Sequence, residues 1–279
     1  MARILMAPGP VRVGVVGSPV AHSRSPQLHL AAYAALGLTR WSYDRIECDA
    51  AGLPAFVGSL GAEWVGLSVT MPAKLAALQL ADTATERARA VGAANTLVRG
   101  SSGWHADCTD VDGITGALAQ LGWGRPELAG RRAVVLGAGG TARAVLVALA
   151  GLGVREVDLA VREPGRAAGA LASAHNAGLS TTVLRLAEPE LARSCSGAAV
   201  TVSTLPAAAS ELVAAAVSRC AAVLDVVYDP WPTPLAAAVH AAGGAVVGGL
   251  AVLLHQAYQQ VELFTGQRAP REVMAAALH

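Results

Sequence analysis

Apolar runs alternate with amphipathic stretches along this chain, and the alternation predicts its secondary structure. Short runs rich in Val, Leu and Ala predict strands at 11–16, 41–46, 66–69, 131–136, 156–161, 198–203, 221–227 and 244–247. Longer segments with apolar residues three and four apart predict helices at 26–36, 53–60, 72–80, 114–121, 144–152, 166–176 and 250–264. Strands that alternate with helices are typical of an α/β fold, in which parallel sheets carry helices on their faces.

A boundary between two domains is expected near residues 111–130. There a helix and a loop rich in Gly, Arg and Pro precede a second strand that runs into glycine, as the first strand does at Gly17. The length of 279 residues suits one large domain or two ordinary ones. Near the other end, Gly266 closes an amphipathic helix whose inward face is formed by Leu250, Leu253, Leu254, Ala257, Val261 and Phe264.

A glycine-rich turn follows the strand at 131–136 and opens the next helix. Its pattern is Gly137-x-Gly139-x-x-Ala142, which in this context is typical of a dinucleotide-binding site. Gly137 permits the tight turn, Gly139 lets the backbone approach a pyrophosphate, and Ala142 allows close packing of helix on strand. The alternative is an ordinary strand-to-helix turn in a chain rich in Ala and Gly, but the position between strand and helix favours nucleotide binding.

The residues after the next strand bear on the choice of cofactor. An NAD-binding protein usually offers an acidic residue there to the ribose. This chain offers Arg162, with Arg166 one helical turn later, and two guanidinium groups favour the extra 2′-phosphate of NADP. Glu163 lies between them and is an unfavourable neighbour for a phosphate, so NAD stays open as the alternative.

The composition excludes several classes of protein. With 53% hydrophobic and 15% charged residues the chain can bury a sizeable core, and its net charge of +1 argues against binding to nucleic acid or to an anionic membrane. No apolar stretch reaches the length of a membrane span, and Pro8, Gly9 and Pro10 interrupt any signal-peptide pattern. The cysteines and histidines show no metal-ligand spacing, and scattered thiols suit a cytoplasmic protein. The cysteines are Cys48, Cys108, Cys195 and Cys220.

Lys74 is the only lysine among 21 cationic side chains. A lysine amine can give up its proton and act as an acid or base, whereas a guanidinium stays charged. Pro72 fits the first turn of the predicted helix, with Thr70 or Met71 as its cap. Lys74 would then lie where the helix dipole disfavours a cation. A solvated surface lysine is the alternative, but the arginine-only background favours a role in catalysis.

Seven short motifs follow one another along the chain. They are His22-Ser23-Arg24-Ser25-Pro26, the stretch at 68–74, the stretch at 92–97, Thr109-Asp110, the turn at 134–140, Asp225-x-x-Tyr228-x-Pro230-x-x-Thr233-Pro234-Leu235 and Gln256-Ala257. Together they resemble shikimate dehydrogenase over nearly the whole length. The resemblance implies an NADP-dependent enzyme that reversibly reduces 3-dehydroshikimate to shikimate on the route to chorismate and the aromatic amino acids.

The resemblance also implies the arrangement of the domains. Residues 1–110 and 249–279 would form the substrate-binding domain, an α/β unit completed by the C-terminal helix, and residues 111–248 a Rossmann-type NADP domain. The substrate would lie in the cleft between them. The implied partners are the small molecules shikimate and 3-dehydroshikimate, without nucleic acid or membrane, and both a monomer and a homodimer are compatible with the sequence.

Individual roles carry over to matching positions. Lys74 would donate and accept the proton, paired with Asp110, while Ser23 and Ser25 would hold the substrate carboxylate. The ring hydroxyls would be read by Thr70, Asn95, Asp110 and Gln256, with Tyr228 beside the same pocket. The nucleotide contacts would be Glu86, Gly137, Ala138, Gly139, Gly140, Thr141, Arg162, Arg166, Val226 and Gly249.

Simpler explanations exist for single residues. Ser23 and Ser25 could cap the helix that starts near Pro26, and Asn95-Thr96 could form a turn. Gln256 could be a buried amide satisfied locally, and Tyr228 a packed aromatic ring. The joint match in order and spacing favours the functional assignment over these alternatives.

Four positions depart from the family's usual pattern, and two functional alternatives remain. Ser68, Cys108 and Val161 stand where Asn is common, and Val252 where Met is common. None of these departures removes Lys74 or Asp110. The alternatives are an NAD-dependent quinate/shikimate dehydrogenase and a non-catalytic nucleotide-binding regulator on the same fold.

Overall fold

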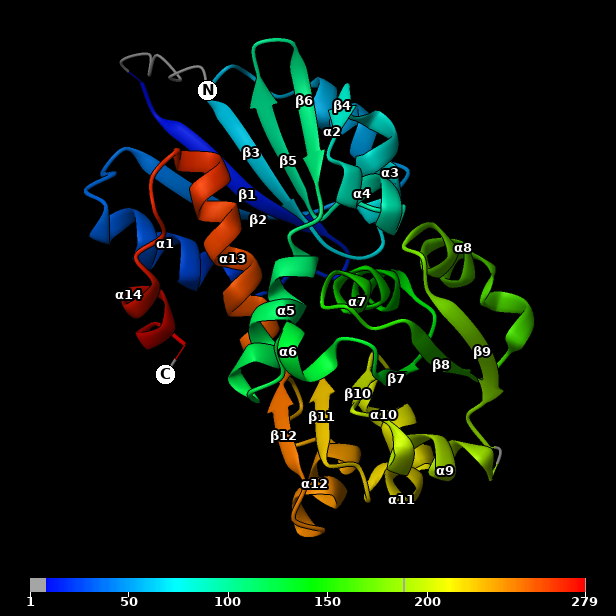
Figure 1. Ribbon diagram of the computed structural model, residues 1–279. Helices are drawn as coiled ribbons and strands as arrows, with labels where there is room; N and C mark the ends of the chain where they lie inside the picture. Colours follow the sequence, from blue (N-terminus) through cyan, green and yellow to red (C-terminus); the bar gives the residue numbers. More distant parts are fainter. Residues whose placement is uncertain (1–8, 188, 279) are drawn as a thin grey trace. The chain divides into compact units, whose positions relative to one another are not determined.

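The computed structural model of the protein describes residues 9–187 and 189–278 (Figure 1). The chain divides into two compact units, of which the first comprises Met1–Thr109 and Gln256–His279 and the second Asp110–His255. Helix α13 (Gly249–Thr265) therefore begins in the second unit and ends in the first. The boundary predicted at residue 249 coincides with the first residue of this helix, seven residues before the division at Gln256.

The sheet of the first unit has the strand order β2-β1-β3-β5-β6-β4. The strands β1, β2 and β3 pair in parallel, whereas β5 pairs antiparallel with both β3 and β6. The bounds are β1 (Val11–Gly17), β2 (Trp41–Glu47), β3 (Trp64–Val69), β4 (Thr83–Ala84), β5 (Thr96–Gly100) and β6 (Gly103–Asp107).

The parallel pairing expected for the sheets holds for β1, β2 and β3, whereas β5 and β6, which were not predicted as strands, pair antiparallel. Two serines alone separate β5 from β6, and such a short link can join only antiparallel neighbours. Gly103, at the end of the link, has a φ of 116°, which favours glycine over any residue with a side chain.

Helices cover both faces of this sheet. On one face α2 (Leu53–Gly58) and α3 (Lys74–Leu80) contribute to a buried cluster with Leu67 and Leu97 of the sheet. On the other face α13 approaches β3 so closely that the Phe264 ring occupies the place of a side chain at Gly66. The unit also contains α1 (Ser25–Ala35), α4 (Glu86–Val91) and α14 (Arg271–Ala276), and α14 packs against α1.

The second unit contains an all-parallel sheet with the order β12-β11-β10-β7-β8-β9. Counted within the unit, this is the strand order 6-5-4-1-2-3 of a doubly wound nucleotide-binding fold, and the order reverses between β7 and β10. The bounds are β7 (Arg132–Leu136), β8 (Glu156–Val161), β9 (Ser180–Arg185), β10 (Val200–Ser203), β11 (Ala222–Asp225) and β12 (Ala245–Gly248). The predicted Rossmann-type domain is confirmed.

Helices also flank the second sheet on both faces. On one side α7 (Gly140–Gly151) packs against α5 (Asp110–Gln120) and α8 (Ala168–Asn176) (Figure 1). On the other side a buried cluster joins the sheet to α9 (Glu190–Gly197), α11 (Ala214–Val217) and α12 (Pro234–Ala241). The short elements are α6 (Arg125–Leu128), η1 (Pro164–Arg166), α10 (Ala207–Ser210) and η2 (Glu211–Val213).

The helix predicted at 72–80 begins at Lys74, two residues later than expected. Neither Thr70 nor Met71 caps it, because Ala73 occupies the cap position and no side chain accepts a hydrogen bond there. Thr70 lies three residues before the cap position, and its backbone amide still donates to the Val16 carbonyl of β1 at 2.8 Å. Lys74 nevertheless lies in the first turn, as predicted.

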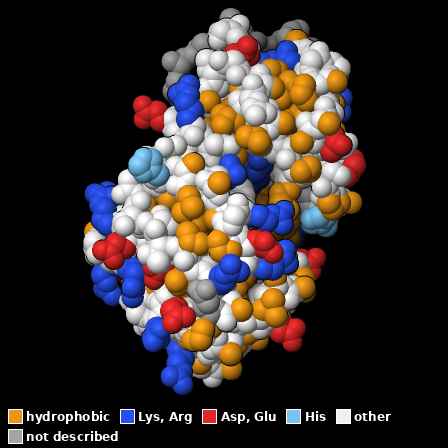
Figure 2. All heavy atoms as spheres, turned by 90° about the vertical axis from the view of Figure 1, so that its right-hand side faces the viewer, with side chains coloured by type: hydrophobic (Ala, Val, Ile, Leu, Met, Phe, Trp, Pro, Cys, Tyr) orange, Lys and Arg blue, Asp and Glu red, His pale blue; other side chains and the backbone are white. Residues whose placement is uncertain are grey.

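No helix among residues 9–187 and 189–278 is both long and apolar enough to cross a bilayer. Cationic and anionic side chains are interspersed on the face that Figure 2 shows, as expected for a net charge of +1.

Candidate functional site

The glycine-rich turn lies at the carboxyl end of β7, next to the point where the strand order reverses. Gly137 has a φ of 99°, and a side chain there would meet the Thr204 hydroxyl at 2.5 Å. The backbone of β7 holds this hydroxyl in place, because Thr204 donates to the Leu136 carbonyl at 2.8 Å. The conformation and the close approach therefore both require glycine at position 137.

The reason for glycine at positions 139 and 140 is different. A side chain at Gly139 or Gly140 would meet no protein atom within 4 Å, so nothing in the fold itself requires glycine at either position. Gly139 is also the N-cap of α7, without a side chain that would satisfy the first amides of the helix. Bare backbone at a helix start is what a phosphate group needs for close approach. The turn fits a dinucleotide.

The two arginines predicted to select NADP follow the carboxyl end of a strand, at the same end of the sheet as this turn. Arg162 follows β8, the strand that pairs in parallel with β7, and Arg166 ends the 3-10 turn η1. Both side chains are exposed, as is that of Glu163 between them. The backbone amide of Arg166 donates to the Glu163 carbonyl at 3.0 Å, which closes the turn directly after Arg162.

Val226 and Gly249, the other predicted nucleotide contacts, adjoin each other. A side chain at Gly249 would overlap the Val226 carbonyl, so glycine is required at the start of α13. Buried Asp225 holds the loop, because it accepts hydrogen bonds from Thr233 at 2.5 Å and from the Val227 amide at 3.3 Å. Burial raises the pKa of this carboxyl above its ordinary value. Tyr228 is half-buried in the same loop.

In the first unit the structure brings Asn95 and Gln256 together. The Asn95 side-chain nitrogen donates to the Gln256 amide oxygen at 3.3 Å and to the Thr109 hydroxyl at 3.0 Å. The Asn95 oxygen accepts from the Thr109 backbone amide at 2.7 Å and from the Thr96 hydroxyl at 2.8 Å. Asn95 is thus a buried, hydrogen-bonded residue, and the simple turn considered for it does not describe its role.

Gln260 lies one turn further along α13 and was not predicted as a site residue. It is 1% exposed, and both ends of its amide are used. Its oxygen accepts from Ser68 at 2.8 Å, and its nitrogen donates to the Asn95 carbonyl at 3.1 Å and to the Thr96 hydroxyl at 2.9 Å. A glutamine beside Val261 on the apolar face of a predicted helix was the signal that could have identified it.

The two serines predicted to hold a carboxylate lie at the start of α1. The helix begins at Ser25, and Ser25 is therefore not its N-cap; Arg24 occupies that position without a side-chain cap. The Ser23 hydroxyl accepts a hydrogen bond from the Ser25 amide at 3.3 Å. The alternative that the serines cap the helix is therefore supported only in part, and only for Ser23. The Ser23 carbonyl in turn accepts two hydrogen bonds from Arg45 of β2, at 3.0 and 2.6 Å.

Thr70 and Lys74 border the start of α3. Both side chains are half-buried, and the Lys74 carbonyl accepts from the Ala94 amide at 2.9 Å, which ties the helix start to the segment before Asn95. Exposed Glu86 is the first residue of α4, after the Thr85 cap. Asp110 is buried and begins α5.

An ion pair that was not predicted holds the segment that leads to Asp110. Arg87 donates to both carboxylate oxygens of Asp107, at 2.7 and 2.6 Å, and the Cys108 amide donates to one of them at 2.8 Å. Burial raises the pKa of Asp107, but the hydrogen bonds from Arg87 and Thr85 outweigh it, so the pKa lies below its ordinary value. Asp107 is therefore a charged anchor for β6 and the residues after it.

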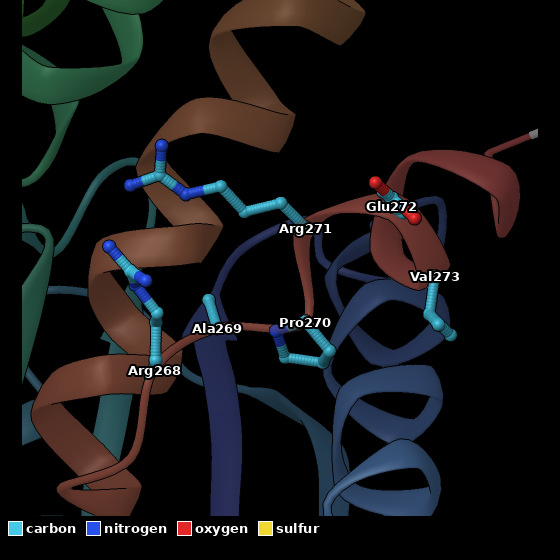
Figure 3. Close-up of a pocket in the computed structure, with 6 residues that line it drawn as sticks. All are labelled: Arg268, Ala269, Pro270, Arg271, Glu272 and Val273. Carbon is cyan, nitrogen blue, oxygen red and sulfur yellow. The ribbon is translucent and has the colours of Figure 1, made fainter.

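A shallow pocket of about 380 Å³ lies at the start of α14 (Figure 3). It is lined by Arg268, Ala269, Pro270, Arg271, Glu272 and Val273. None of the predicted site residues lines it, and Arg271 stacks on Tyr258, with its guanidinium carbon 5.2 Å from the ring centroid. The pocket is separate from the candidate site.

Comparison with known proteins agrees with this geometry. Family models for the shikimate dehydrogenase substrate binding domain and the shikimate 5'-dehydrogenase C-terminal domain match residues 15–97 and 249–279. The NADP(+) shikimate dehydrogenase of Methylobacterium radiotolerans is 43% identical over 267 residues, which cover 92% of this chain and 92% of that protein.

Solved structures give the same result. Mycobacterium tuberculosis shikimate dehydrogenase is 53% identical, with a TM-score of 0.90 over 96% of this chain and 99% of that one. The shikimate 5-dehydrogenase of Thermus thermophilus, solved in complex with NADP(H) and shikimate, is 32% identical, with a TM-score of 0.79 over 96% of this chain and 98% of that one. This chain belongs to the shikimate dehydrogenase family.

Proposed function

We propose that this protein catalyses the reversible, NADP-dependent reduction of 3-dehydroshikimate to shikimate. The observation that carries the proposal is the buried contact between Asn95 and Gln256, which joins two predicted hydroxyl-reading residues from distant parts of the chain. The family to which the chain belongs and the dinucleotide turn at the end of β7 support the same reaction.

The substrate is held by polar side chains of the first unit. Ser23 and Ser25 donate hydrogen bonds to its carboxylate, and Thr70, Asn95 and Gln256 read its ring hydroxyls. Charge-assisted hydrogen bonds to a carboxylate are stronger than those between neutral groups. The serines therefore determine the orientation in which the substrate binds, with its carboxylate beside them.

The chemistry that NADPH supplies when bound is hydride donation. Lys74 stabilises the negative charge that develops on the ketone oxygen and delivers a proton to it, and Asp110 pairs with Lys74. In the reverse direction Lys74 accepts the proton of the substrate hydroxyl. The turn from Gly137 to Thr141 would hold the pyrophosphate, with Val226, Gly249 and Glu86 as further contacts.

The cofactor is NADP because Arg162 and Arg166 supply two guanidinium groups at the end of the sheet where the glycine-rich turn lies. Glu163 is the one feature that favours NAD and, with it, a quinate/shikimate dehydrogenase. Retention of Lys74 and Asp110 disfavours a non-catalytic regulator, which needs no acid–base pair.

One assay tests the proposal and both alternatives. The purified full chain is mixed with shikimate and NADP+, with shikimate and NAD+, or with quinate and either nucleotide, and the absorbance of the reduced nicotinamide is followed. We expect turnover with shikimate and NADP+ to exceed that of all other combinations. Equal turnover of quinate would favour the dehydrogenase alternative, and no turnover at all would favour the regulator.

Location and assembly follow from the same proposal. A cytoplasmic location is supported by four cysteines that form no disulfide, at Cys48, Cys108, Cys195 and Cys220. A homodimer stays a prediction, which light scattering coupled to size-exclusion chromatography tests.

A further inference from the structure

Tyr43 lies in β2, far in sequence from every predicted site residue, yet its hydroxyl reaches two of the positions discussed above. The residue is 4% exposed. Its hydroxyl donates to the Ser68 hydroxyl at 2.6 Å and is also hydrogen bonded to the side chain of Ser25. Burial raises the pKa of Tyr43 well above its ordinary value, so the phenol is neutral and has one proton to give.

Gln260 decides the direction of the hydrogen bonds in this cluster. Its nitrogen donates to the Asn95 carbonyl and the Thr96 hydroxyl, so its oxygen must face Ser68. An amide oxygen only accepts, and Ser68 therefore gives its proton to Gln260 and can only accept from Tyr43. With the proton of Tyr43 directed at Ser68, the phenol oxygen accepts from Ser25.

The same strand supports the neighbouring residue. Arg45 lies two positions after Tyr43 and so on the same side of β2. It donates to the Ser23 carbonyl through two nitrogens, at 3.0 and 2.6 Å. The ring of Tyr43 is itself fixed, because it stacks on buried His29 with 4.2 Å between the ring centroids. Adjacent side chains of β2 thus hold both serines.

We propose that Tyr43 is a positioning residue for the part of the site that binds the substrate carboxylate. It acts by orienting the hydroxyl group of Ser25. The inference rests on the proposed function, in which Ser25 donates to the substrate carboxylate. When the Ser25 hydroxyl donates to the substrate carboxylate, it no longer donates to Tyr43. The Tyr43 hydroxyl then rotates and donates to Ser25 instead of to Ser68. Ser68 keeps its hydrogen bond to Gln260.

This rotation changes only hydrogen bonds, and no proton leaves its oxygen. A hydroxyl that accepts a hydrogen bond becomes a stronger donor, because hydrogen bonds in a chain polarise one another. Tyr43 therefore favours an anionic carboxylate over a neutral group at this position. It selects substrates that are acids and has no part in hydride or proton transfer.

Tyr43→Phe tests the proposal, with Tyr33→Phe as the matched control. Tyr33 is also a buried tyrosine beside His29, 2% exposed, and its hydroxyl lies 3.5 Å from the His29 ring nitrogen rather than near a predicted substrate residue. Steady-state kinetics with saturating NADP+ would give kcat and KM for shikimate. Calorimetry would give the Kd of shikimate and of its methyl ester, which lacks the charge.

We expect Tyr43→Phe to raise KM and Kd for shikimate about tenfold, equivalent to about 1.4 kcal/mol. We expect kcat to change less than about twofold. The ratio of the Kd for the methyl ester to the Kd for shikimate should fall by the same factor of about ten. Tyr33→Phe should leave all of these values near wild type. In a Ser25→Ala background, Tyr43→Phe should add little, because its target is gone.

Three results would overturn the proposal: equal effects of both tyrosine variants, an undiminished effect of Tyr43→Phe without the Ser25 hydroxyl, or equal weakening of acid and ester. The ratio of acid to ester affinity does not depend on the folded fraction, so it remains decisive if the variant is unstable. Wild-type protein that bound no shikimate would instead contradict the proposed function itself.

Discussion

The amide nitrogen of Asn95 lies 3.3 Å from the amide oxygen of Gln256, although 161 residues separate them in the chain. Asn95 immediately precedes β5, and Gln256 lies in α13, so this contact joins the N-terminal part of the first unit to its C-terminal helix. Thr109, which accepts from Asn95 at 3.0 Å, lies at the end of the same part of the chain. Two distant parts of the chain thus meet at the Asn95 amide.

The contact predicts that Asn95 and Gln256 act together on the substrate. Asn95→Ala and Gln256→Ala should each raise KM for shikimate about tenfold, and the double variant should raise it by less than the product of the two. The reason is that either single change already breaks their hydrogen bond. Gln259→Ala, on the same helix but only partly buried, is the control and should leave KM unchanged. Fully additive effects would show that the two amides act independently.

Local patterns predicted most of the nucleotide unit. Strands β7, β8, β10 and β11 are mostly apolar and buried, and β7 is followed directly by the glycines that start α7, whereas β9 is polar and partly exposed and was not predicted. The chemistry of the turn, the tight conformation at Gly137 and the arginines after β8 all depend on residues close in sequence. For that reason the sequence predicted strand, turn, helix and cofactor residues together.

The first unit was less predictable, because its site depends on long-range contacts. The hairpin of β5 and β6 contains Arg99 and His105, which weaken the apolar signal of two short strands. Tyr43, Ser68 and Gln260 meet across two strands and a helix, and no local spacing shows which buried polar groups will pair. Buried Gln260 was not predicted as a site residue, and only the fold shows its partners.

The exposed arginines after β8 predict the choice of cofactor. Replacing Arg162 and Arg166 together by Ala should weaken NADP binding and change NAD binding little, since only NADP carries the 2′-phosphate. A hydrogen bond to a charged group contributes about 1.5–3 kcal/mol, so each arginine should account for at least about a tenfold change in Kd. Calorimetry with each nucleotide checks this, and Arg155→Ala serves as an exposed arginine outside the turn. Equal loss of both nucleotides would assign the arginines to structure.

The position of Lys74 at the first residue of α3 predicts a role that arginine cannot fill. Lys74→Arg keeps the charge but removes a transferable proton, because a guanidinium does not deprotonate in proteins. We expect kcat to fall at least about 100-fold, with Kd for NADP unchanged. Lys74→Ala should fall as far or further, since it also removes the charge beside the ketone oxygen.

Asp110→Asn completes this test. If Asp110 and Lys74 act as a unit, the loss in kcat for the double variant should be smaller than the product of the single losses. The measurement is kcat across pH, with folding checked by circular dichroism. A folded Lys74→Arg variant with near-normal kcat would show that the proton comes from another group.

His29 predicts how the stability of the protein depends on pH. It is fully buried against Tyr33, Tyr43, Phe264 and Gln260, and burial lowers its pKa to about 3. The hydrogen bond with Gln260 opposes this shift but is the smaller effect. In the unfolded chain a histidine takes up a proton below a pH of about 6.5. Between about pH 6.5 and pH 3 the unfolded state therefore binds a proton that the folded state does not.

Stability from this site is thus complete above about pH 6.5 and decreases as the pH falls, by about 1.4 kcal/mol per unit. His29→Phe keeps a ring against Tyr43 and cannot titrate. Between about pH 7.5 and 4.5 we expect wild type to lose about 2–3 kcal/mol more in free energy of unfolding than this variant. Urea denaturation at a series of pH values measures the difference, and His22→Ala, at an exposed histidine, should follow wild type. Parallel curves for wild type and His29→Phe would mean that His29 takes up its proton without unfolding.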